Sequence, residues 1–109
     1  MINRQTQVIR WQETTLPDEQ VLRQRMQEEG LSSYTWSNGP YDTYAIHNHD
    51  YEKVLYCLRG SIRFVLHDVS EAERNVDLGP GDCMILPRSM RHSAQVGSKG
   101  VTCLEAARY

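Results

Sequence analysis

Two histidines two residues apart, His47 and His49, are the side chains whose type and spacing most clearly indicate chemistry. Residues two apart on a β-strand project from the same face, so both imidazoles would point in one direction. Neutral imidazole is the commonest protein ligand for zinc, iron, copper and nickel. Two histidines alone are also compatible with a surface or hydrogen-bonded pair, so the pair predicts a metal site only together with its surroundings.

The residues around this pair resemble two motifs of the cupin family. The segment from His47 to Gly60 reads HNHDYEKVLYCLRG and is similar to the first motif, in which His-x-His and a short spacer precede a glutamate, six residues and a glycine. The segment from Gly81 to His92 reads GDCMILPRSMRH and resembles the second motif, which has a glycine, a proline and a final histidine. Twenty residues separate Gly60 from Gly81, which is room for the strand and loop that the family has there.

The resemblance implies an all-β fold, a small antiparallel barrel of the jelly-roll kind, to which the residue pattern adds one N-terminal amphipathic helix. It also implies that His47, His49 and His92 bind a divalent transition metal, namely iron, zinc, manganese or nickel. A barrel brings the ends of distant strands together, so His92 can meet the other two histidines. Metal sites of this type keep open positions for water or substrate.

The chain departs from the first motif at the usual carboxylate position, which is occupied by Lys53, with Glu52 one residue earlier. A shift of one residue on a regular strand turns a side chain to the opposite face. Three alternatives follow, of which we favour the first. The site is formed by three histidines only, or a bulge near residues 50–51 turns Glu52 inward as a fourth ligand, or metal binding is lost and Lys53 holds an anion with the histidines.

Lys53 also bears on the ligand, because a charged ammonium is repelled by a divalent cation unless an anion lies between them. We therefore predict a ligand whose carboxylate, or a similar group, bridges the metal and Lys53; the alternative is a solvated Lys53 at the rim. Tyr44 and Arg91 are further predicted substrate-binding residues. Trp36 and Tyr56 are also candidates for the pocket, and Glu105 is a candidate for a hydrogen bond that supports a ligand histidine. Packing in the core or in a dimer interface is the alternative for each of these aromatic residues and for Tyr44. Ser89 stands where the second motif has a glycine, and Gly39 lies two positions before the glycine of the first motif.

The elements expected to position these residues are one helix and several short strands. A start signal at residues 15–18 and a terminal Gly30 predict a helix over about 17–29. Short apolar and alternating segments separated by turn signals then predict an antiparallel barrel or sandwich. Residues 1–30 are expected to form a strand and helix extension packed on a barrel of residues 31–109. The predicted strands are 34–36, 43–48, 53–58, 61–67, 83–87, 92–96 and 101–106, with turns at 59–60, 78–81 and 97–100 and a loop at 69–75.

Length and composition narrow the class of protein. A chain of 109 residues with 39% hydrophobic and 24% charged residues is expected to fold as one globular domain. A net charge of −2 argues against nucleic-acid binding, and neither a membrane span nor a signal peptide is evident. The three cysteines form no Cys-x-x-Cys pair and are interpreted as buried reduced thiols, which favours the cytoplasm. A homodimer is expected, because an unpaired sheet edge otherwise invites aggregation.

The sequence thus predicts a metal-binding cupin, with a small metal-dependent oxygenase or isomerase that acts on a small anionic substrate as the candidate activity. The alternative is a non-catalytic module that binds or senses a small anion or sugar. A degenerate barrel kept for assembly is the third hypothesis. Fold alone does not choose among them.

Overall fold

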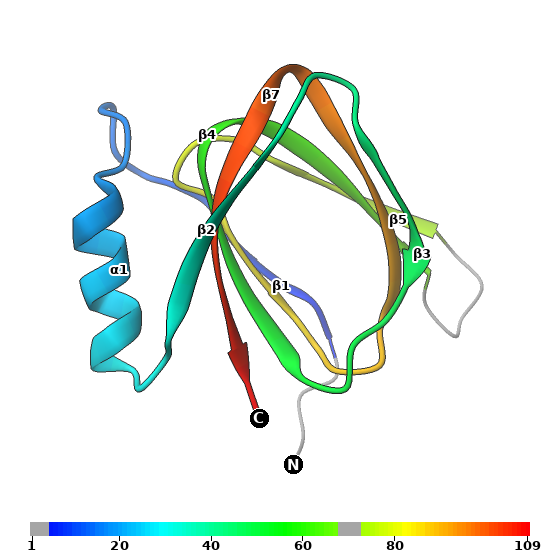
Figure 1. The fold of residues 1–109 in the computed structure, drawn as a ribbon, viewed down its shortest axis with the longest axis horizontal. Helices are drawn as coiled ribbons and strands as arrows, with labels where there is room; N and C mark the ends of the chain where they lie inside the picture. Colours follow the sequence, from blue (N-terminus) through cyan, green and yellow to red (C-terminus); the bar gives the residue numbers. More distant parts are fainter. Residues whose placement is uncertain (1–4, 68–72) are drawn as a thin grey trace.

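The computed structural model describes residues 5–67 and 73–109, and these residues form an antiparallel β-barrel with one helix. The interior is enclosed by the strands, and the helix lies outside them beside β2 (Figure 1). The elements are β1 (Gln7–Ile9), α1 (Glu19–Glu28), β2 (Ser33–Asn38), β3 (Thr43–His47), β4 (Glu52–His67), β5 (Glu73–Leu78), β6 (Cys83–Leu86) and β7 (Arg91–Arg108).

Two long strands, β4 and β7, run through both halves of the barrel. Over their whole length they pair with each other in antiparallel register. The first half of β4 also pairs with β6, and the last part of β7 with β2, which gives the order β1-β6-β4-β7-β2. The second half of β4 pairs with β5, and the first part of β7 with β3. The same two strands therefore contribute to two facing sheets.

Glycines bend these strands where turns were predicted. Gly60 has φ 76°, and the register with β7 shifts on both sides of it. A Cβ at Gly60 would lie 2.0 Å from the carbonyl oxygen of Gly100, which has φ 77°. The predicted turns at 59–60 and 97–100 are therefore wrong, because the chain continues through both as bulged strand. Left-handed glycines serve turns and bulges alike, so the local signal does not separate the two.

The helix begins two residues later than predicted. Asp18 is the N-cap, and its carboxylate accepts hydrogen bonds from the backbone N–H groups of Gln20 and Val21 at 2.8 and 3.3 Å. Leu22 and Met26 are fully buried against the outer face of the sheet that β6, β4 and β7 form. No helix of the described residues is long and apolar enough to cross a membrane.

Alternation along β4 assigns each side chain to the barrel interior or to the helix side. In the first half of the strand, Leu55 and Cys57 belong to the interior core, whereas Val54 and Leu58 belong to the core under α1. In the second half, the predicted alternation is confirmed, with the buried residues Ile62, Phe64 and Leu66 on the interior face. The predicted burial of three free cysteines is also confirmed for Cys57, Cys83 and Cys103.

The remaining elements largely match their predicted positions. Strand β5 begins at Glu73, so the predicted loop is wrong for residues 73–75, and residues 68–72 of that loop lie outside the described residues. At the N-terminal end, β1 pairs with β6, and α1 packs on the sheet that contains them. The helix thus covers one sheet from outside, β1 extends that sheet at its edge, and the interior face is left to the histidines.

Candidate metal centre

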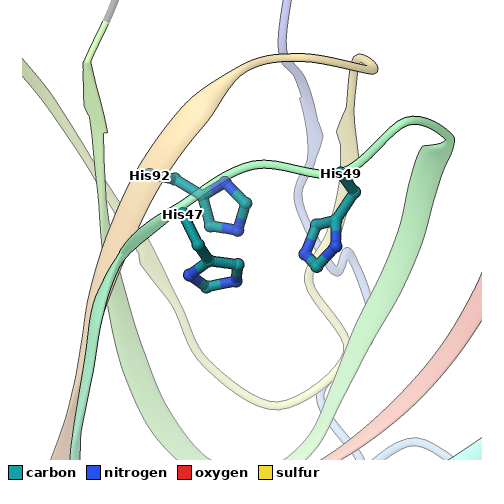
Figure 2. Close-up of side chains that lie close together, drawn as sticks. All are labelled: His47, His49 and His92. Carbon is teal, nitrogen blue, oxygen red and sulfur yellow. The ribbon is translucent and has the colours of Figure 1, made fainter.

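The three predicted ligand histidines meet at one end of the barrel interior. One ring nitrogen from each of His47, His49 and His92 lies within 4.8 Å of the others. His47 ends β3 and is the direct register partner of His92 on β7. His49 follows in the β3–β4 connection, which is tied to the β6–β7 connection by the 2.7 Å hydrogen bond from Ser89 N–H to His49 O. Figure 2 shows His49 facing the other two rings.

Backbone contacts orient two of these rings so that a nitrogen of each is free for the cluster. The Nδ1–H groups of His47 and His92 donate to the carbonyl oxygens of Ala45 and Met90, at 2.8 and 2.9 Å. This tautomer leaves the Nε2 lone pair of each ring free. The buried Nε2 atoms of His49 and His92 have no hydrogen-bond partner among the described residues.

The donor set fits a divalent transition metal. A buried polar atom without a partner costs about 1–3 kcal/mol, and a metal ion bound by these nitrogens would remove that cost. Imidazole ligands suit zinc, iron, copper and nickel, and three of them leave coordination positions open. The cluster can therefore hold a metal ion.

Electrostatics keep two of these histidines in the neutral form that metal binding requires. Burial is the main cause that lowers the pKa of His92 from its ordinary 6.5 to about 4, and the charge of Lys53 acts in the same direction. Burial also lowers the pKa of His49, with the charge of Lys53 as the second cause. Both rings are thus uncharged at neutral pH.

The lowered pKa of His92 predicts that the metal-free protein loses stability in mild acid. Below pH 6.5 the unfolded chain takes up a proton at this residue, which the folded chain resists until about pH 4. The free energy of unfolding should therefore fall by about 2 kcal/mol between pH 7 and pH 5 on account of His92. Urea unfolding at the two pH values measures this loss. A His92→Asn variant should show a shallower loss, and equal slopes in both proteins would contradict the assignment.

Glu52 and Lys53 take opposite faces of β4. The Glu52 carboxylate accepts a 2.7 Å hydrogen bond from Arg108 Nη1, away from the cluster. The structure therefore does not bring Glu52 to the histidines, and the cluster contains no carboxylate among the described residues. The Lys53 side chain is 9% exposed and points inward. It is buried, so the alternative of a solvated Lys53 at the rim is wrong.

A cavity of about 280 Å³ adjoins the histidines, between the two sheets. Of the predicted substrate-binding residues, Lys53 and Tyr44 line it, and so does Trp36. Arg91 is exposed and is absent from the lining, because it precedes His92 and its side chain takes the other face of β7. The structure thus does not support Arg91 as a substrate-binding residue. The lining consists of Tyr34, Trp36, Tyr44, His47, His49, Tyr51, Lys53, Phe64, His92, Ala94 and Glu105.

Glu105 and Lys53 form a buried ion pair in the cavity wall. The two groups are 3.6 Å apart, and their side chains are 6% and 9% exposed. Tyr34 O–H and Trp36 Nε1–H donate to the two oxygens of the Glu105 carboxylate, at 2.7 and 3.0 Å. The expected role of Glu105 in supporting a histidine is therefore wrong, since its carboxylate instead holds Lys53.

Sequence patterns did not single out Tyr34 and Tyr51, which also line the cavity. Tyr34 lies directly opposite Glu105 in the register between β2 and β7. Tyr51 stacks on His49, with ring centroids 4.8 Å apart, and contacts Tyr109 at the chain end. Tyr51 could have been predicted from the sequence, because it lies two residues after the candidate ligand His49. The pairing of Tyr34 with Glu105 could not, because it depends on a strand register that the sequence leaves open.

Two residues at positions where the motifs have glycine adopt the left-handed backbone conformation. Ser89, where the second motif has a glycine, adopts φ 69°, and Tyr41, two positions after Gly39, adopts φ 63°. This region favours glycine, and other residues adopt it at a cost of about 1–2 kcal/mol. Both turns therefore keep the conformation that glycine favours although glycine is absent.

A known protein family matches most of the chain. The family described as "Cupin domain" matches residues 38–105, a segment that includes all three histidines, Lys53 and Glu105. No curated protein matches the chain significantly.

Solved structures give matches at the level of the fold. A variant of Bacillus subtilis oxalate decarboxylase is 26% identical, with a TM-score of 0.66, over 72% of this chain and 21% of that one. A further structure of that enzyme is described by its Mn(II) centres. The TDP-quinovose 3,4-ketoisomerase of Campylobacter jejuni is 21% identical, with a TM-score of 0.61, over 72% and 62% of the two chains.

A third matched structure is described as a domain and not as an enzyme. The Drosophila melanogaster CENP-C cupin domain is 19% identical, with a TM-score of 0.64, over 69% of this chain and 59% of that one. The chain spans about a fifth of the length of the first matched structures, among them the coconut allergen cocosin. At these sequence identities the matches show a shared fold, and one fold can carry different activities.

Proposed function

The chain belongs to the cupin domain family, and from this premise we propose that it is a metal-dependent cupin acting on a small anionic substrate. His47, His49 and His92 bind the metal, and the adjoining cavity binds the substrate. The observation that carries the proposal is the pair of buried, unpartnered Nε2 atoms beside a cavity that contains a buried ammonium. The unpartnered nitrogens are costly in the folded protein unless a cation occupies the site, and the ammonium, which Glu105 already pairs, lies where it can also attract an anion.

Each side chain has a distinct task in this proposal. His47 and His92 present Nε2 atoms of rings that backbone carbonyls hold in place. Lys53 attracts and orients the anionic group, and Glu105 holds Lys53 in place. A bound divalent metal would supply a Lewis acid or a redox centre with open coordination positions, which suits an oxygenase or an isomerase. The manganese of one matched enzyme and the ketoisomerase activity of another support this class of reaction.

A binding or sensor module is the second candidate, and one observation favours it. Glu105 is the sole carboxylate among the described residues that line the cavity, and both of its oxygens already accept hydrogen bonds. The described lining thus offers no free carboxylate as a general base. Turnover of candidate anions by the metal-loaded protein in air separates the two, because a module that only binds leaves the anion unchanged.

Replacing Lys53 by methionine tests the proposed function. Lys53→Met removes the ammonium and keeps most of the side-chain volume, so affinity for acetate should fall at least about tenfold in the metal-loaded protein. Metal content should stay the same or rise, because the repulsion between the ammonium and the metal is removed. Calorimetric titration and plasma mass spectrometry measure the two quantities.

Lys99→Met is the matched control, since Lys99 is exposed and outside the cavity lining. It should leave both the metal content and the acetate affinity unchanged. Equal acetate affinity in the wild type and in Lys53→Met would show that Lys53 does not bind the anion.

A further inference from the structure

We propose that the ligand of the cavity is a small ring-bearing monocarboxylate, with its carboxylate beside Lys53 and the metal and its ring against the aromatic wall. This rests on the proposed function and narrows its substrate class. The class of ligand follows from which polar groups of the cavity wall are free to bind it and which already form hydrogen bonds within the protein.

The aromatic residues of the wall present ring surface to the cavity. Tyr34 O–H and Trp36 N–H are engaged by Glu105, and Tyr44 O–H donates to Asn38. Phe64 is 3% exposed and has no polar side-chain atom. Trp36 and Tyr44 meet edge to face, with centroids 6.0 Å apart, which fixes both rings. With these three polar ends engaged, this part of the wall favours an apolar, ring-shaped body over a sugar, whose hydroxyls need free hydrogen-bond partners.

The charged groups require an anionic head. The charges of Lys53 and Glu105 cancel, and imidazole binds a metal as a neutral ligand, so a bound divalent cation leaves the site with an uncompensated positive charge. An anion beside the metal and Lys53 compensates part of that charge.

The kind of cationic group favours a carboxylate over a phosphate. Phosphate sites commonly use the forked guanidinium of arginine or a helix N-terminus. Among the described lining residues there is no arginine and the lone ammonium belongs to Lys53, while α1 lies outside the barrel. One ammonium and one metal suffice for the two oxygens of a carboxylate.

The size of the cavity limits the ring-bearing body. A volume of about 280 Å³ corresponds to about nine water molecules in the liquid. This is room for a single ring and its carboxylate. Tyr51 stacks on His49 at the same site and contributes a further ring to the lining.

The test compares three probes on the zinc-loaded full chain by calorimetric titration. Benzoate has the ring and the carboxylate, acetate has the carboxylate alone, and phenyl phosphate has the ring with a different anion. Benzoate should bind about 10- to 100-fold more tightly than acetate, as expected for burial of one ring, and more tightly than phenyl phosphate. Phe64→Leu, which keeps an apolar side chain and removes the ring, should weaken benzoate several-fold and leave acetate unchanged.

The outcomes distinguish this inference from the proposed function. If benzoate and acetate bind equally and Lys53→Met weakens both, the anion site stands and the ring-bearing class is overturned. If phenyl phosphate binds most tightly, the carboxylate assignment is overturned. If none of the probes binds while zinc is bound, the anion site fails and this inference fails with it.

Discussion

Replacing Glu105 by leucine should destabilise the protein by about 3–5 kcal/mol, because it leaves the buried ammonium of Lys53 without its counter-ion. The substitution also removes the acceptor for Tyr34 O–H and Trp36 N–H. Tyr34 is 53% exposed and can donate to water instead, so the unpaired charge dominates the loss. Urea unfolding of the metal-free protein at pH 7 measures the change.

The double variant Lys53→Met/Glu105→Leu is the matched control for this prediction. It removes both charges and keeps apolar side chains of similar volume, which is often neutral for a buried ion pair. Most of the stability lost in Glu105→Leu should therefore return. If the double variant is as unstable as the single one, the loss reflects packing, and Glu105 is then not the group that holds Lys53.

Replacing His92 by asparagine should lower metal affinity at least about 100-fold. His92 is 1% exposed, its Nε2 has no partner among the described residues, and its ring is fixed by the Met90 carbonyl. Loss of a residue that only orients a ligand typically costs 10–100-fold in affinity, so loss of a ligand costs at least as much. Competition titration with a zinc-binding dye measures the affinity of each protein.

His67→Asn serves as the matched control for the loss of a histidine. His67 ends β4, lies near Glu73 and is outside the cluster. Its substitution should leave zinc affinity unchanged. Equal affinities for wild type and His92→Asn, with both proteins folded, would exclude His92 as a ligand.

The parts of the site that follow from spacing could be predicted from the sequence. His47 and His49 share a face because they are two residues apart, and the motif spacings connected them to His92. The same alternation separated Lys53 from Glu52, and the structure places the two on opposite faces as a regular strand requires.

The parts that depend on register and long-range packing could not be predicted. The contact of Glu105 with Lys53 and Tyr34 requires β4, β7 and β2 to be neighbours in a particular register. Gly60 was interpreted as a turn because a left-handed glycine serves turns and bulges alike, and only its pairing partner decides between them. Homodimer formation depends on contacts with a second chain, and it stays a prediction.

Metal analysis tests most directly whether the three histidines, which come from different parts of the chain, form one metal site. Untagged protein purified without chelator should carry close to one divalent transition metal ion per chain by plasma mass spectrometry, and His92→Asn purified in parallel should carry far less. Protein that holds no metal, even after reloading with zinc, manganese, iron and nickel salts, would contradict the account. The cavity would then be a site where Lys53 and the histidines hold an anion without metal.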